Sequence, residues 1–148
     1  MRALGLDLGS RRIGVAVSDG DGLVATPVEV LQRSGDRHGD HRCIAALVDE
    51  WEADVVVVGI PYSLDGSVGP MARKMGEEAD EIAAHLAVPV ETYDERLTTV
   101  TAERSLMEQD LRGPRRRQIV DMVAAAVMLQ AWLDSRRGGG GVPEAEDG

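Results

Sequence analysis

Three acidic residues lie among apolar neighbours, where an ordinary protein core excludes carboxylates. Asp7 lies inside the strand-like stretch 3–9, Glu95 follows a short apolar stretch, and Asp121 lies inside the largely apolar stretch 119–133. An ionised carboxylate in such surroundings is costly unless it is paired or coordinates a metal. Three such positions in one chain therefore indicate a shared cation.

Carboxylate oxygens are the ligands that Mg²⁺ and Mn²⁺ prefer. Hydrolysis of a phosphodiester requires a polarised phosphate, an activated water and stabilisation of the departing oxygen, and two metal ions bridged by carboxylates supply all three. Two bare carboxylates about 4 Å apart repel each other by ~4 kcal/mol at an effective dielectric of about 20. The sequence thus predicts a magnesium- or manganese-dependent enzyme acting on phosphate esters, with Asp7, Glu95 and Asp121 as both catalytic and metal-binding residues.

Each of these residues also has an ordinary structural interpretation. Asp7 could cap a turn at the end of a strand by accepting backbone hydrogen bonds. Glu95 competes with Asp94, because adjacent strand residues face opposite sides, and the residue left outside the site could pair with Arg96. Asp121 could be a first-turn acid favoured by the helix dipole. The residues alone leave these alternatives open.

Length and charge limit the class of protein. The chain has 148 residues, enough for one domain, and its formal net charge of −10 speaks against coating nucleic acid through bulk attraction. Three of the negative charges lie in a glycine-rich acidic tail, which we expect to be disordered over 138–148 beyond a single domain at 1–137. No apolar run is long enough to span a bilayer, and no signal-peptide pattern opens the chain, so we expect a cytoplasmic protein without membrane contact.

Hydrophobic periodicity and turn residues predict an α/β fold. We expect two strands within 1–18 joined at 10–12, a turn at 19–22 and a third strand over 23–31, followed by a strand at 55–58 and a strand at 88–93. Helices are expected around 44–51 and over 71–86, 98–111 and 115–137. Together these elements describe a mixed five-stranded sheet, a three-strand antiparallel meander plus two parallel strands, flanked by helices.

The first strand has one apolar and one small-residue face. Leu4, Leu6 and Leu8 alternate with Gly5, Asp7 and Gly9. We expect open space above the Asp7 carboxylate, as in a strand that lines a cleft. Because sites in such sheets form beyond the carboxyl ends of neighbouring parallel strands, Asp7 and Glu95 are expected near one another.

Four motifs, taken in order, resemble a known family. They are Gly5-Leu6-Asp7-Leu8-Gly9-Ser10 with Gly14-Val15-Ala16, Val58-Gly59-Ile60-Pro61 with Asp65-Gly66, Tyr93-Asp94-Glu95-Arg96-Leu97-Thr98-Thr99, and Val120-Asp121 with Ala124-Ala125. This ordered set, over about residues 3–134, is similar to the YqgF family of Holliday-junction-resolvase-like nucleases, also described as pre-16S ribosomal RNA nucleases.

The resemblance implies more than the residues do alone. It implies a ribonuclease H-like fold, assigns the family's acidic positions to Asp7, Glu95 and Asp121, and so selects Glu95 over Asp94. It further implies a role in maturing the 5′ end of small-subunit ribosomal RNA. We expect structured RNA, ribosomal precursor particles or branched DNA as partners, and a monomer or weak homodimer.

Arginines offer candidate contacts to a nucleic-acid backbone. The basic loop of the family appears at 109–118 with arginine in place of most of the expected lysine. Beside a carboxylate cluster, bidentate binding of phosphate is favoured over a merely solvated loop. The predicted substrate-binding residues are Arg11, Arg96, Arg112, Arg115, Arg116 and Arg117.

The remaining reactive side chains are expected to be structural. A lone Cys43 should be a small buried thiol, and Trp51 and Trp132 should lie in the core. Surface positions without a catalytic role are expected for the three histidines, His38, His41 and His85.

Two functions of other classes compete with a nuclease. The segment 7–14 is similar to the phosphate loop of sugar kinases and actin-like proteins, which predicts an ATP-binding module, although those proteins close two such domains over the nucleotide. A non-catalytic RNA-binding or assembly factor that keeps an inherited site is the other alternative.

Overall fold

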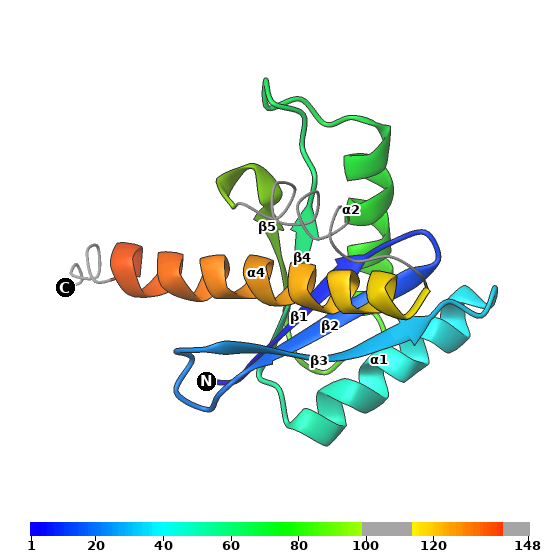
Figure 1. Cartoon of the computed structure of the whole chain (residues 1–148), viewed down its shortest axis with the longest axis horizontal. Helices are drawn as coiled ribbons and strands as arrows, with labels where there is room; N and C mark the ends of the chain where they lie inside the picture. Colours follow the sequence, from blue (N-terminus) through cyan, green and yellow to red (C-terminus); the bar gives the residue numbers. More distant parts are fainter. Residues whose placement is uncertain (99–113, 141–148) are drawn as a thin grey trace.

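The sheet has five strands in the order β3-β2-β1-β4-β5 (Figure 1). The computed structural model describes residues 1–98 and 114–140, with the side chains of 117–137 in the second range. Strand β1 pairs antiparallel with β2 and parallel with β4, while β3 and β5 pair with the outer sides of β2 and β4. The strands are β1 (Ala3–Leu8), β2 (Arg12–Ser18), β3 (Ala25–Gln32), β4 (Val55–Ile60) and β5 (Val90–Asp94). The predicted meander and parallel pair are confirmed.

Helices cover both faces of this sheet (Figure 1). Helices α1 (Arg37–Trp51) and α2 (Pro70–Ala83) pack on one face, and α4 (Pro114–Gly140) crosses the other. A short 3₁₀ turn, η1 (Glu95–Leu97), follows β5 directly. The predicted helix 98–111 lies outside the described residues except for Thr98. Helix α4 ends three residues into the segment in which we expected the tail to begin.

Side-chain alternation along β1 produces two cores. Leu4, Leu6 and Leu8 enter the core shared with α1 and α2, as predicted. Ala3, Val55 and Val57 face the other core, which includes Trp132 of α4. Every residue of β4 is buried, because a continuous β-branched run in a central parallel strand is covered on both sides.

Glycines on the second face of β1 and β2 admit helix α4. A Cβ atom at Gly5 would lie 2.9 Å from the Leu129 Cβ, and one at Gly14 would overlap the backbone carbonyl of Asp121. The predicted open space above β1 is therefore wrong in part: the small residues make room for a close helix. Asp7 is consequently buried, with 8% of its surface exposed.

Helix α1 begins earlier than the apolar pattern indicates. Its first turn is polar, and its buried face includes Asp40 and His41 as well as Ile44. The expected surface position of His41 is wrong, since this ring is fully buried, and the expected burial of Cys43 is also wrong, since this thiol is exposed. Within the described residues, no helix combines the length and the apolar character needed to cross a bilayer.

Candidate active site

The end of β5 directs Asp94 and Glu95 to different partners. Asp94 accepts a hydrogen bond from the Arg96 backbone N–H at 2.9 Å and forms an ion pair with the Arg96 guanidinium. These bonds to Arg96 lower the pKa of the Asp94 carboxyl below its ordinary value. The Glu95 carboxylate instead lies over Gly59, where its Oε2 would be 2.5 Å from an added Cβ. The structure thus separates the two acids that the residues alone left in competition.

Asp7 and Glu95 lie on the same face of the sheet. Leu6 of β1 pairs with Val58 of β4, so Asp7 and Gly59 are each the next residue on adjacent parallel strands. Because the side chain of Glu95 covers Gly59, it lies beside Asp7 at the carboxyl ends of these strands. This is the edge at which α/β sheets build their sites.

Helix α4 brings Asp121 to the same corner. Asp7 pairs across the sheet with Gly14, and the backbone of Asp121 crosses directly over Gly14. Gly5 and Gly59 meet Leu129 and Met128 further along the same helix face. The close crossing therefore fixes the height and register of Asp121 above β1 and β2.

The carboxylate of Asp121 is engaged by Arg12. The Arg12 Nε lies 2.6 Å from the Asp121 Oδ2, and both side chains are about one-fifth exposed, 22% and 19%. Sequence analysis missed Arg12. The two residues are 109 positions apart, and only the crossing of α4 over β2 brings them together. No local pattern signals such a pair.

The predicted substrate-binding arginines fall into three groups. Arg96 is held by Asp94 and stacks over the Tyr62 ring at 5.8 Å, so it positions the loop after β4. The Arg11 side chain is exposed and makes no ion pair with the described residues, and Arg117 is exposed near the start of α4. Arg112 lies outside the described residues, as do the side chains of Arg115 and Arg116.

A buried ionic network supports the turn between β1 and β2. Arg33 donates from Nε to the Gly9 carbonyl at 2.7 Å and from both terminal nitrogens to the Glu78 carboxylate at 2.8 and 2.9 Å. The His41 Nε2 lies 2.8 Å from the same carboxylate. Sequence analysis missed this network as well. It ties α1, α2 and the end of β3 to the turn that follows Asp7.

Comparison with known proteins decides the family. Residues 1–135 match the family model RuvX, described as Holliday junction resolvase. The chain belongs to the RuvX family. The resemblance that the four motifs indicated is thereby confirmed, and membership of a family of this description places the chain among the nucleases, which hydrolyse phosphodiester bonds.

Relatives and solved structures agree with this assignment. A Mycobacterium ulcerans protein named "Putative pre-16S rRNA nuclease" is 50% identical over 138 residues, covering 92% of this chain and 80% of its own. A Myxococcus xanthus protein of the same name is 47% identical over 137 residues, covering 93% and 90%. The structure of Thermus thermophilus RuvC with a Holliday junction substrate shares the fold, with a TM-score of 0.59 at 21% identity over 93% of this chain and 96% of that one. The predicted ribonuclease H-like fold is confirmed.

The donor chemistry of this RuvX-family site suits a hard divalent cation. Asp7, Glu95 and Asp121 offer oxygen ligands only, as Mg²⁺ and Mn²⁺ require. Among the residues that the structure describes, however, no three acidic, histidine or cysteine side chains lie close enough together to hold one ion. Arg12 supplies the positive charge at Asp121. The shared metal site thus stays a prediction, in which the cation would compete with Arg12 for the charge of the Asp121 carboxylate.

Arg12→Gln is expected to strengthen magnesium binding. Without metal, the variant should lose about 1 kcal/mol of stability, because the partly buried Asp121 carboxylate loses its partner. Removing the competing cation should tighten magnesium binding roughly fivefold, equivalent to about 1 kcal/mol. Thermal unfolding with and without millimolar magnesium measures both effects. Arg11→Gln removes the same charge from the adjacent residue and should leave the magnesium response unchanged; equal responses in both variants would refute the competition.

The Glu78 network predicts a specific dependence of stability on pH. Burial alone would raise the pKa of the Glu78 carboxyl, but hydrogen bonds from Arg33 and His41 and the charges of Arg33 and Arg37 hold that pKa below its ordinary value of 4.5. A lowered folded-state pKa contributes stability that is present above the unfolded value and is lost as the pH falls through the folded value. Acidification below about pH 4.5 should therefore destabilise the wild type through this group.

Glu78→Gln tests this pH dependence. At neutral pH the variant should be about 3 kcal/mol less stable than the wild type, since it leaves Arg33 without its buried partner. The difference should shrink as the pH falls below about 4.5. Urea unfolding across this range measures it, with the exposed neighbour Glu77→Gln as control. A difference that stays constant with pH would contradict the assignment.

Proposed function

We propose that this RuvX-family chain is a metal-dependent nuclease that matures the 5′ end of pre-16S ribosomal RNA. The names of the mycobacterial and myxobacterial relatives support the substrate. The observation that supports the proposal is that Asp7 and Glu95 lie on one face of the sheet at the ends of neighbouring strands, and that the Asp121 backbone crosses over Gly14 on that face.

Each residue has a distinct task in this proposal. Asp7, Glu95 and Asp121 would hold Mg²⁺ or Mn²⁺, which supplies the polarisation of the phosphate and the activation of water when bound. Arg112, Arg115, Arg116 and Arg117 would contact backbone phosphates next to the site. Arg96, paired with Asp94, would keep the loop after β4 in place beside the substrate.

The acidic composition supports local rather than extended contact with nucleic acid. A net charge of −10 repels a phosphate backbone over most of the surface, so binding depends on a few arginines. We propose that the chain acts in the cytoplasm, on free precursor RNA or on ribosomal precursor particles, as a monomer or weak homodimer.

Branched DNA is the second candidate substrate, favoured by the description of the RuvX family model. Purified protein incubated with a precursor 16S RNA fragment or a synthetic four-way DNA junction, with magnesium or manganese, tests both. Cleavage of the RNA near the mature 5′ end supports the proposal. Cleavage of the junction alone would show that DNA is the substrate. If both the RNA and the junction stay uncleaved, the nuclease proposal is refuted.

A further inference from the structure

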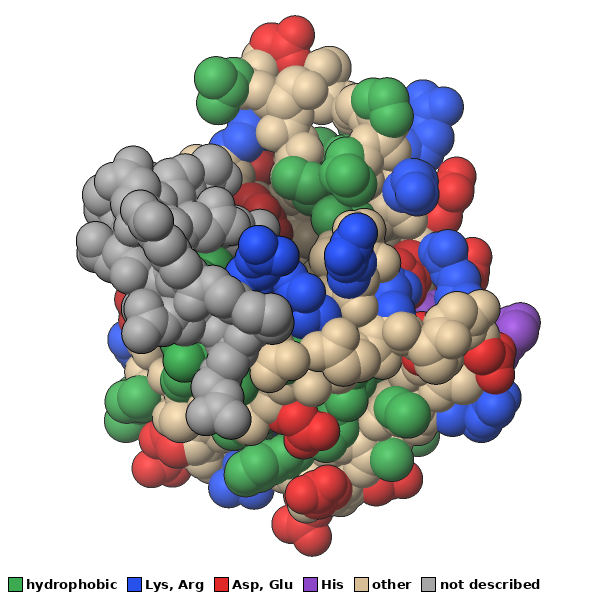
Figure 2. Space-filling model, turned by 45° about the vertical axis from the view of Figure 1, so that its right-hand side comes forward, with side chains coloured by type: hydrophobic (Ala, Val, Ile, Leu, Met, Phe, Trp, Pro, Cys, Tyr) green, Lys and Arg blue, Asp and Glu red, His purple; other side chains and the backbone are tan. Residues whose placement is uncertain are grey.

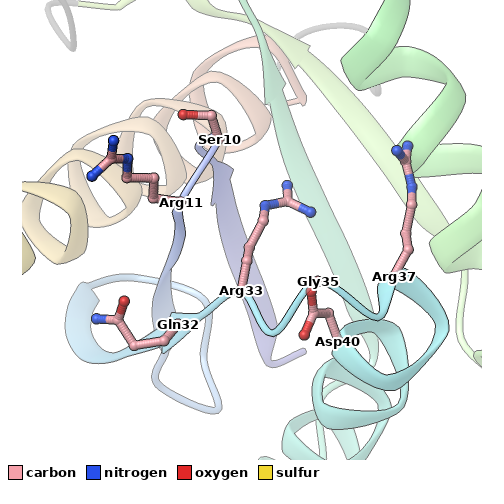
Figure 3. Close-up of a pocket in the computed structure, with 7 residues that line it drawn as sticks. All are labelled: Ser10, Arg11, Gln32, Arg33, Gly35, Arg37 and Asp40. Carbon is pink, nitrogen blue, oxygen red and sulfur yellow. The ribbon is translucent and has the colours of Figure 1, made fainter.

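A hollow lies on the opposite side of the β1–β2 turn from the three carboxylates. Its volume is about 480 Å³, it is open to solvent, and two chain connections line it. Ser10 and Arg11 come from the β1–β2 turn, whereas the other lining residues run from the end of β3 into the first turn of α1 (Figure 3). These others are Gln32, Arg33, Gly35, Arg37 and Asp40. A space of this size holds a small ligand or part of a polymer.

Positive groups predominate on the wall of the hollow. Arg11, Arg33 and Arg37 line it together with a single carboxylate, Asp40. Both oxygens of that carboxylate accept hydrogen bonds from Ser34, whose hydroxyl lies 2.8 Å from Oδ1, so Asp40 is satisfied inside the connection. Figure 2 shows Lys and Arg side chains gathered across the middle of this side of the molecule. In a chain of net charge −10, three arginines gathered at one hollow offer charged donors to an anion, while Glu78 and Glu81 balance part of their charge.

Arg33 is a fixed wall of the hollow. Its bonds to Gly9 and to both oxygens of Glu78 use three of the five N–H donors of a guanidinium. Because Glu78 is buried and also contacts His41, the guanidinium is held in one orientation before any ligand arrives. Two N–H donors of Arg33 are left for an anion. Because the fold already fixes the guanidinium, binding an anion costs little further side-chain entropy.

Backbone groups add to the attraction for an anion. The first N–H groups of a helix have no partner within the helix, and the N-cap residue of α1, Asp36, makes no capping bond with its side chain. Gly35 precedes it with φ +90°, and nothing lies within 4 Å of the position of its absent Cβ. A ligand can therefore approach the backbone closely at the start of α1.

Arg11 and Arg37 supply adjustable charge. Arg37 is 45% exposed; its Nε bonds Glu81 at 2.8 Å and its Nη2 lies 3.9 Å from Glu78, which leaves Nη1 without an ion pair among the described residues. Arg11 makes no ion pair with the described residues, and in Figure 3 it projects from the neighbouring turn away from Arg33. As a long exposed side chain, it can turn toward an anion bound between them.

The hollow and the carboxylates share one turn of backbone. The strand that carries Asp7 ends at Leu8, and Arg33 binds the carbonyl of the next residue, Gly9. On the far side of the same turn, Arg12 binds Asp121. We propose that the hollow binds a backbone phosphate of the nucleic-acid substrate. This phosphate belongs to the same nucleic-acid strand as the phosphate that is cleaved at the carboxylates and lies further along it. This inference rests on the proposed function and adds Ser10, Arg33, Arg37 and the start of α1 to its contacts.

Binding measured without cleavage tests this phosphate subsite. A labelled precursor 16S RNA fragment is titrated with protein in EDTA at several salt concentrations. One lost phosphate contact should lower the slope of log affinity against log salt by about 0.7 to 0.9, and weaken binding about fivefold at about 0.15 M salt. We expect these changes for Arg11→Gln and for Arg37→Gln. Arg73→Gln, an exposed arginine of α2 outside the hollow, should change neither quantity.

The outcomes separate this proposal from the nuclease itself. Unchanged affinity and slope in both variants, with thermal midpoints like the wild type, would overturn the subsite. Weaker binding of inorganic phosphate with unchanged binding of RNA would also overturn it, because the hollow would then be a small-anion site. If the wild type binds RNA with the expected slope change in the variants and yet cleaves nothing with magnesium, the subsite stands and the nuclease proposal fails.

Discussion

Asp7→Asn is expected to reduce cleavage of precursor RNA by about a thousandfold, which corresponds to ~4 kcal/mol of transition-state stabilisation. Asparagine has nearly the same shape, so the pairing of Asp7 with Gly14 and the packing of α4 should persist. What is lost is one negative oxygen of the metal site that we propose for Asp7, Glu95 and Asp121. Rates of product formation from the RNA fragment, measured under single-turnover conditions, give the size of the effect.

The same substitution has a second readout that does not depend on catalysis. A ligand present at about a hundred times its dissociation constant stabilises the folded state by about 2.7 kcal/mol, or roughly 5–10 °C in melting temperature for a domain of this size. Magnesium should produce this gain in the wild type and little of it in Asp7→Asn. Asp80→Asn, an exposed carboxylate on α2, should keep the full gain. A magnesium response that Asp7→Asn retains would show that the ion binds elsewhere.

Local sequence patterns were enough to predict the strands and which side of the sheet their residues face. Alternation at Leu4, Leu6 and Leu8 placed Asp7 on the opposite face, and the run of valines gave a strand covered on both sides, as the structure confirms. Helix α1 was predicted too short because its first turn carries polar groups. Polar partners bury this end of the helix, Glu78 of α2 for His41 and Ser34 for Asp40, so the end has no apolar periodicity to detect.

In the candidate site, too, pairs between near neighbours in the chain could be predicted and pairs between distant elements could not. That Asp94 or Glu95 would pair with Arg96 followed from their spacing, and the structure gives this pairing to Asp94. The pairs Arg12 with Asp121 and Arg33 with Glu78 join distant elements, and their formation depends on how α4 and α2 pack against the sheet. Sequence spacing carries no signal for such tertiary pairs, which is why both were missed.

Glycines near the carboxylates also had a different role from the one expected. Small residues next to an acid were interpreted as the floor of a cleft. In the structure they are the surface on which α4 rests, and only their lack of a Cβ allows the helix to come so close. The same residues thus position Asp121, because a helix displaced outward would carry its carboxylate away from Asp7.

Gly14→Ala should therefore be the most destabilising addition of a single methyl group in this region. The added Cβ would overlap the Asp121 carbonyl, a backbone atom that cannot rotate away as a side chain can. We expect a loss of about 3 kcal/mol, at the upper end of the range for overpacking, and a fall of roughly 6–12 °C in melting temperature. Denaturant unfolding and thermal unfolding measure these changes.

Gly76→Ala is the matched control for this substitution. Gly76 lies within α2, and nothing outside its own helix backbone lies within 4 Å of its absent Cβ. Replacing a helical glycine in open space should stabilise the protein by about 0.5–1 kcal/mol. The two identical chemical changes should thus have opposite signs. If Gly14→Ala were instead as stable as the wild type, α4 would not cross β2 at this point, and the placement of Asp121 beside Asp7 would be wrong.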